Sequence, residues 1–320
     1  MNKRFELLVL VALLAMSSMV AYDYFNNVEL AQIDAVMQSY FNDIGGYATA
    51  PTQWRVLSPF IMKVFVDTLS AVVPFKTAFT VVYASWCFGC IFMLAVMMYS
   101  WLSRLFKPEH ALIGVMLMLG TMPIALRDHF YAPYSLLEPV LFTIACILIA
   151  DGRDWLVLPL VIVATLNRET GALIAVLYGA AHVNQVLFGT KRERLNVLLY
   201  SAVLVAAATI TYVTIRLVRG PAWDCVGGIA GVWGINTMTM NLYHSAINLT
   251  MFAGAIAVMA AFGIGRAPAL CRRMALLVPV FATMIAVWGV WYEVRMLMPL
   301  YPLMLPLAVS AMGQPKQVAH

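Results

Sequence analysis

Long apolar stretches alternate with short polar segments along the whole chain. The predicted membrane spans are residues 5–22, 77–102, 111–126, 136–150, 197–215, 246–264, 274–291 and 296–312. Stretches of this length and composition form helices that cross the roughly 30 Å hydrocarbon core of a bilayer. The runs are continuous and lack the period of two that a transmembrane β-strand requires. The pattern therefore predicts an all-α polytopic membrane protein.

Residues 155–188 require a different path through the membrane. A single span here would invert the sidedness of every later segment, yet the stretch is too short for two full spans. A helical hairpin with its tip at Asn167–Thr170 resolves the conflict. Its first arm, Trp155 to Leu166, measures about 18 Å, so we expect the charged tip at membrane depth, where it must line a water-filled cavity. With this hairpin, the prediction is about ten transmembrane helices.

A long segment, residues 23–75, separates the first two spans. Apolar residues at helical spacing run through residues 28–44, and Gly45-Gly46 ends them. Residues 55–73 form a second such stretch that carries Lys63 and Asp67. We therefore predict two amphipathic helices at the outer membrane surface, within a single membrane domain that covers residues 1–320.

Composition narrows the class further. Of the 320 residues, 63% are hydrophobic and only 11% are charged, too few for the surface of a soluble domain. The formal net charge is +5, but the basic residues are scattered over the polar segments and form no stripe. A nucleic-acid partner is therefore not expected, whereas a lipid bilayer is.

Basic residues cluster in every second polar segment. They are Lys3, Arg4, Arg104, Lys107, Lys191, Arg192, Arg194, Arg266, Arg272, Arg273 and Lys316. Because cytoplasmic segments of membrane proteins carry an excess of Lys and Arg, these segments and both termini are predicted to be cytoplasmic. The expected location is the inner or plasma membrane.

The alternate segments, which this rule places outside, carry further arginines and most of the acids. These arginines are Arg55, Arg127, Arg168, Arg216, Arg219 and Arg295. Ionisable groups at membrane level are costly, so their clustering on one side indicates a functional site. A carboxylate can take the proton of an acceptor hydroxyl, and arginine binds a phosphate leaving group with its planar fork. The pattern predicts group transfer from a lipid phosphate at the outer face.

Each charged group also has a structural interpretation. Arg168 and Glu169 can form a self-neutralising pair at a helix tip, and Glu293 with Arg295 can form an interfacial anchor. The acids of residues 23–43 can each be a solvated surface carboxylate. Their joint presence on one side is what favours the functional interpretation.

Short motifs at the outer ends of the predicted helices resemble those of the GT-C membrane glycosyltransferases. They are the acidic segment Asp23 to Asp43, Arg55-Val-Leu-Ser-Pro59, Glu138-Pro139, Asn167-Arg-Glu-Thr170 and Glu293-Val-Arg295-Met-Leu-Met-Pro299. The resemblance covers most of the chain by layout, and members of this group use sugars linked to polyprenyl phosphate. It implies a polyprenyl-phosphate-linked sugar donor and a glycan or lipid acceptor of the cell envelope.

The resemblance also implies residue roles. The acceptor base is expected among Asp34, Glu29 and Asp23, in that order. The expected substrate-binding residues are Arg55, Arg168, Glu169, Arg295, Glu293 and Glu138. Some members use a divalent cation, and the dispersed acids of this chain leave that question open. The alternative function is a multi-pass transporter or lipid-linked glycan flippase, although the sequence shows no internal repeat.

Overall fold

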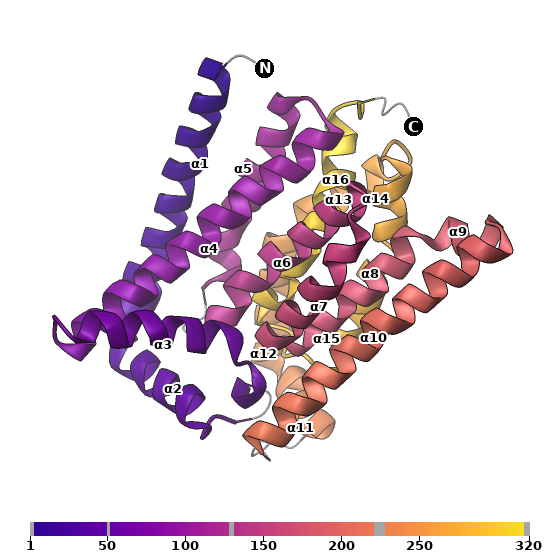
Figure 1. The fold of residues 1–320 in the computed structure, drawn as a ribbon. Coiled ribbons are helices and arrows are strands. Elements are labelled where there is room, and N and C mark those ends of the chain that lie inside the picture. The colour runs from indigo at the N-terminus through magenta and orange to yellow at the C-terminus, as the bar shows by residue number, and fades with distance from the viewer. Residues whose placement is uncertain (1–2, 50–51, 128–130, 221–227, 317–320) are drawn as a thin grey trace.

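The computed structural model describes residues 3–49, 52–127, 131–220 and 228–316, and all regular structure in these ranges is helical (Figure 1). The α-helices are α1 (Lys3–Tyr24), α2 (Ile33–Gly45), α3 (Leu57–Ser70), α4 (Phe75–Leu105), α5 (Pro108–Ala125), α6 (Pro133–Ala150), α7 (Val157–Asn167), α8 (Leu173–Ala181), α9 (Val183–Phe188), α10 (Lys191–Arg219), α11 (Gly228–Thr237), α12 (Thr239–Leu249), α13 (Ala255–Gly263), α14 (Ala269–Met274), α15 (Leu277–Trp288) and α16 (Tyr301–Met312). Short π or 3-10 turns are η1 (Phe25–Glu29), η2 (Leu30–Gln32), η3 (Thr52–Trp54), η4 (Asp154–Leu156), η5 (Glu169–Ala172), η6 (Thr250–Gly254) and η7 (Val294–Leu300). The predicted all-α fold is confirmed.

Within the described ranges, eight helical segments are long and apolar enough to cross a membrane. They are Arg4–Gly45, Phe75–Leu105, Pro108–Ala125, Pro133–Ala150, Lys191–Arg219, Thr239–Gly263, Ala269–Trp288 and Val294–Met312. Two further apolar segments, Asp154–Asn167 and Glu169–Ala181, are shorter. The chain is thus a membrane protein with eight candidate spans, and the expected total of about ten is reached only if both shorter segments are counted.

The two shorter segments form the hairpin that the sequence predicts. At 1.5 Å per residue, α7 is about 16 Å long and α8 about 14 Å, roughly half of the hydrocarbon core. Both arms are short, where the sequence predicted one, because the chain turns at His182 before α9. Gly171 lets the arms meet closely, since a Cβ at this position would lie 2.3 Å from the carbonyl carbon of Ala164.

The first span continues directly into the amphipathic helix α2. The π turn η1 and the 3-10 turn η2 join α1 to α2, so residues 28–32 are helical turns and α2 begins at Ile33. A π turn adds one residue per turn, and it keeps Tyr24 and Glu29, five residues apart, on the same buried face. The buried stripe of α2 is Ile33, Val36, Tyr40 and Asp43. Gly46, with φ of +78°, ends α2 as the sequence predicts.

The connection between α10 and α12 differs from the sequence-based expectation. The predicted spans on either side end at residue 215 and resume at residue 246, but α10 extends to Arg219, α11 is helical, and α12 begins at Thr239. Residues 221–227 lie outside the described part. The reason is tertiary contact: Asn236 Nδ2 donates to the Gly289 carbonyl at 2.9 Å, and Asn236 Oδ1 accepts from the Trp291 N–H at 3.0 Å. These bonds dock α11 on the connection between α15 and η7.

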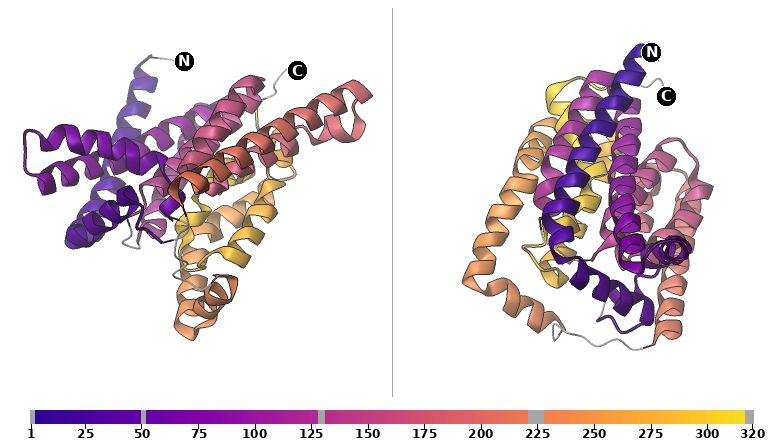
Figure 2. Two further views of the ribbon diagram at one scale, coloured as in Figure 1. Left: turned by 60° about the horizontal axis from the view of Figure 1, so that its bottom comes forward. Right: turned by 90° about the vertical axis from the view of Figure 1, so that its left-hand side faces the viewer.

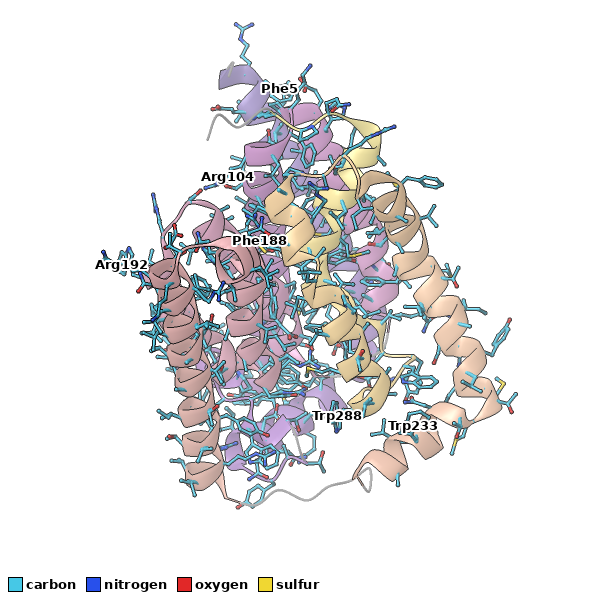
Figure 3. The ribbon with its side chains drawn as sticks, turned by 90° about the vertical axis from the view of Figure 1, so that its right-hand side faces the viewer. Phe5, Arg104, Phe188, Arg192, Trp233 and Trp288 are labelled. Carbon is cyan, nitrogen blue, oxygen red and sulfur yellow. The ribbon has the colours of Figure 1, made fainter. Side chains whose placement is uncertain are left out.

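The first turns of α1 and the last turns of α16 lie at one end of the bundle, called here the terminal end (Figures 1 and 2). α2 and α3 lie across the opposite end, called here the α2–α3 end. At the terminal end, Arg104 pairs with Asp151 at 3.2 Å and so links the ends of α4 and α6. Figure 3 shows Arg104 and Arg192 toward the terminal end, with Trp233 and Trp288 near the other. Figure 2 shows α10 and the α12–α13 segment on different sides of the bundle.

Close helix contacts surround α16 in the middle of the bundle. α13 approaches α16 so closely that a Cβ on Gly263 would lie 1.9 Å from the Leu307 carbonyl oxygen. Small residues permit such backbone approach in membrane helices. The fully buried Trp101 of α4 donates its Nε1–H to the Pro302 carbonyl of α16 at 3.0 Å. α16 is therefore fixed against both α4 and α13.

Candidate functional site

The charged site lies at the tip of the α7–α8 hairpin, next to the first turns of α3 and α6. Asn167, the last residue of α7, is fully buried and connects all three elements. Its Nδ2 donates to the Tyr134 carbonyl at 2.9 Å, and its Oδ1 accepts from the Ser58 hydroxyl at 2.5 Å. The Val56 N–H donates to the Leu166 carbonyl at 3.0 Å. These bonds set the positions of the charged residues on each element.

Arg168 and Glu138 form the most buried ion pair among the described residues. Arg168 Nη1 lies 2.7 Å from Glu138 Oε2, and the two side chains are only 7% and 3% exposed. The Thr170 hydroxyl donates to the other carboxylate oxygen of Glu138. Arg168 Nε is buried and has no hydrogen-bond partner in the described structure. The carboxylate is therefore satisfied on both oxygens, whereas the guanidinium keeps an unused donor.

Arg55, just before α3, forms a second ion pair with Glu169 of the hairpin tip. Its Nε and Nη2 donate to the two carboxylate oxygens at 3.1 Å and 2.5 Å, a bidentate arrangement. Burial opposes the charge of Arg55, but the Glu169 carboxylate outweighs this effect and holds the pKa of Arg55 above its ordinary value. Arg55 therefore stays charged at any working pH. The Glu169 side chain is 31% exposed, so this pair is the part of the site that solvent reaches.

Tyr134 of α6 lies close to the arginines of both ion pairs. The Arg55 guanidinium carbon is 4.5 Å from the centroid of the Tyr134 ring, and that of Arg168 is 6.0 Å away. Both distances are in the range of cation–π attraction. The Tyr134 ring is thus close to both guanidinium groups.

Arg295 is the third buried arginine of the site. It lies at the start of η7, is 8% exposed and pairs with Glu293 at 2.9 Å. It also interacts electrostatically with Tyr134, with Tyr24 and with Glu29. Tyr134 is therefore the common neighbour of all three arginines, which come from three distant parts of the chain.

Glu29 is the acid of the first outer segment that lies beside these arginines. Its side chain is fully buried, and its Oε1 accepts a hydrogen bond from the Tyr24 hydroxyl at 2.5 Å. The Tyr24 hydroxyl also lies 3.4 Å from the Tyr83 hydroxyl. Glu29 Oε2 has no hydrogen-bond partner in the described structure. A carboxylate oxygen is thus available at the edge of the arginine group.

Asp34 and Asp23, the other two acids that the sequence put forward as bases, lie elsewhere. The Asp34 side chain is 74% exposed and pairs with Lys76 at 2.7 Å. Asp23 is exposed and accepts a hydrogen bond from Asn27 at 2.8 Å. The π turn explains this placement, because it brings Glu29 onto the buried stripe and leaves the other two acids off it.

Asp43 is a buried acid that the sequence did not propose as the base. It is 6% exposed and interacts electrostatically with Arg55 and Arg219. A sequence signal for its burial exists, because Asp43 follows the apolar Tyr40 by three residues and so falls on the apolar face of α2.

The other outer arginines have structural roles or lie at the surface. Arg219 donates to carbonyls at the C-terminal end of α2, including that of Ile44 at 3.3 Å, and so caps this helix. The Arg216 guanidinium lies 3.8 Å from the centroid of the Trp54 ring. Arg127 is exposed, and residues 128–130 lie outside the described part.

The arrangement combines three guanidinium groups with carboxylates from four elements. Fixed guanidinium groups stabilise a developing negative charge, and a nearby carboxylate can accept a proton. In the described part of the chain, no group of three or more His, Cys, Asp or Glu side chains has the arrangement of a metal site. Comparison with protein-family models, with curated proteins and with solved structures found no match for this chain.

Proposed function

We propose that this chain is a GT-C-type membrane glycosyltransferase of the cell envelope. It would move a sugar from a polyprenyl-phosphate donor to a glycan or lipid acceptor at the outer face of the membrane. One observation carries the proposal: Arg55, Arg168 and Arg295 converge on Tyr134, with Glu29 beside them. An arginine cluster with an adjacent carboxylate is suited to a phosphate leaving group and a hydroxyl nucleophile.

The proposed step is a direct displacement at the anomeric carbon of the donor sugar. The acceptor hydroxyl oxygen forms a bond to this carbon, and the bond between the carbon and the donor phosphate oxygen breaks. Glu29 takes the hydroxyl proton, and polyprenyl phosphate leaves with the electron pair of the broken bond. Arg168 and Arg295 stabilise the charge that grows on the phosphate, while Glu138, Glu169 and Glu293 orient the arginines.

The proposal includes a membrane topology. With the two hairpin arms counted as crossings, the chain has about ten transmembrane helices, and both termini are cytoplasmic. The terminal end then faces the cytoplasm, and the charged site faces the outside of the inner or plasma membrane. Arg104 and Lys316 near the terminal end support this orientation through the excess of basic residues on the cytoplasmic side.

The test is transfer of labelled sugar by the purified protein in nanodiscs. A panel of polyprenyl-phosphate sugars, each with a labelled sugar, is incubated with lipid and glycan acceptors. We expect Glu29→Gln and Arg168→Gln to lower the transfer rate by at least about 100-fold, in line with the loss of a general base or of a charge-stabilising donor. The matched control is Asp34→Asn, which removes an exposed acid of the same segment and should retain the rate. Full activity in both Glu29→Gln and Arg168→Gln rejects the proposed site.

The alternative is transport or flipping of the lipid-linked donor. The half-length helices of the hairpin favour it, because broken helices with charged ends are common in transporters. The same protein reconstituted into closed vesicles distinguishes the two functions. Movement of the intact donor between leaflets without transfer of label to any acceptor supports the flippase and contradicts the glycosyltransferase.

A further inference from the structure

A cavity of about 200 Å³ lies among α6, α8, α9 and α14, on the far side of the hairpin from the charged site. Its polar lining consists of His182, Asn184, Gln185 and Arg273. The remaining lining residues are apolar: Ile149 of α6, Ala181 of α8 and Leu270 of α14. Since a water molecule occupies roughly 30 Å³, the cavity has room for the heavy atoms of one phosphate group.

Arg273 is a partly buried arginine at the edge of this cavity. Within the described residues it has no ion-pair partner, and its Nε is buried without a hydrogen bond. Arg55, Arg104 and Arg168, by contrast, each face a carboxylate. An unpaired, partly buried guanidinium is costly unless an anion compensates its charge.

The lining of the cavity offers several hydrogen-bond donors. No acidic side chain is among the described residues that line it. His182 donates its Nδ1–H to the Tyr178 carbonyl at 3.0 Å, because a carbonyl can only accept. His182 Nε2 lies 3.8 Å from Asp154, which lines a second, neighbouring cavity. Arg273 and the side-chain amides of Asn184 and Gln185 therefore remain as the groups that can hold an anion.

We propose that this cavity binds a phosphate group, held in the fork of Arg273 with the amides of Asn184 and Gln185. Guanidinium binds phosphate bidentately, which matches a site with one fixed arginine and flanking amide donors. The phosphate can be a lipid headgroup or a soluble ion. The surface beside the cavity is suited to a membrane interface, because Phe188 is 83% exposed and Arg192, at the start of α10, is exposed as well (Figure 3). This site is separate from the proposed transferase site, and its test requires no transferase activity.

The experiment measures binding to the purified full-length protein in phosphatidylcholine nanodiscs. One arm adds phosphatidic acid to the nanodiscs and counts retained lipid by native mass spectrometry. The other arm titrates inorganic phosphate and follows the melting temperature. We expect Arg273→Gln to weaken binding at least tenfold. The matched control, Arg272→Gln, removes the neighbouring exposed arginine of α14 and should change the affinity less than twofold.

The variants also report on folding. Because the Arg273 charge has no partner, Arg273→Gln should melt no lower than the wild type in the absence of phosphate. Arg273→Lys, which keeps the charge but loses the fork, should bind with intermediate affinity. If phosphatidic acid stays bound when millimolar inorganic phosphate is added, the bound phosphate group belongs to a lipid headgroup. If inorganic phosphate raises the melting temperature in nanodiscs that contain no anionic lipid, the ligand is a soluble ion. Equal losses in the Arg272 and Arg273 variants, or no binding of either probe, overturn the proposal.

Discussion

The buried pair of Arg168 and Glu138 allows a structural role to be separated from a functional one. In Arg168→Met, Glu138 keeps only the Thr170 hydroxyl as a partner while its side chain stays 3% exposed. Removing one member of a buried ion pair costs about 3–5 kcal/mol, because the remaining charge is uncompensated. The double variant Arg168→Met/Glu138→Leu has no such charge. It should recover most of this loss, since apolar replacement of a buried pair is often neutral or stabilising.

The assay is unfolding of the detergent-solubilised protein by titration with SDS, followed by far-UV circular dichroism. The same preparations are assayed for sugar transfer. The matched control is Arg104→Met, which breaks an ion pair at the terminal end whose side chains are 37% and 29% exposed. Exposed pairs contribute about 0–1 kcal/mol, so this variant should be close to wild type.

The two readouts should diverge in the double variant. If Arg168 binds the donor phosphate, the double variant regains stability and stays inactive. If it regains both, the pair is only a structural link and Arg168 is not a phosphate ligand. If Arg168→Met and Arg104→Met have equal free energies of unfolding, breaking the buried ion pair costs no more than breaking the exposed one, and the argument from the uncompensated buried charge is refuted.

Three further predictions concern glycines. Gly171→Ala should destabilise the protein by about 3 kcal/mol or more, because its Cβ meets the backbone of Ala164, and SDS titration should show an earlier midpoint. Gly263→Ala should do the same through a clash with the Leu307 carbonyl oxygen, and weakened α13–α16 packing should also speed proteolysis. Gly120→Ala, at a helix position with no atom within 4 Å of the added Cβ, should instead stabilise by about 0.5–1 kcal/mol, and a lower midpoint for this control would contradict the packing argument.

The helical framework could be predicted from the sequence because each element carries its own signal. A long apolar run indicates a membrane span regardless of which helices the span packs against. The eight candidate spans therefore lie where the hydropathy of the sequence places them. Gly45-Gly46 ends α2 because a left-handed backbone at Gly46 is a local requirement. The hairpin is predictable because segment length and the sidedness of charge require it, independently of any long-range contact.

Features that depend on distant residues could not be predicted. Arg55 and Glu169 are 114 positions apart, and nothing local indicates that they pair. α11 is helical because Asn236 docks on the α15–η7 connection, which local composition does not reveal. The buried position of Glu29 depends on the one extra residue of a π turn. A prediction that assumes 3.6 residues per turn throughout assigns the residues after that turn to the wrong face of the helix.

The cost of the charged site is itself an argument for function. Buried ion pairs are weak evidence for stability, and ionisable groups at membrane level are costlier still. Yet this chain gathers Arg55, Arg168 and Arg295 around one ring, next to the tip of a hairpin whose arms are about half as long as the hydrocarbon core. The hydrogen bonding is also incomplete, because the Arg168 Nε donor and the Glu29 Oε2 acceptor are buried without hydrogen-bond partners. A leaving phosphate needs such a donor and an attacking hydroxyl needs such an acceptor, so the two unsatisfied atoms are the ones that a bound substrate pair would complete.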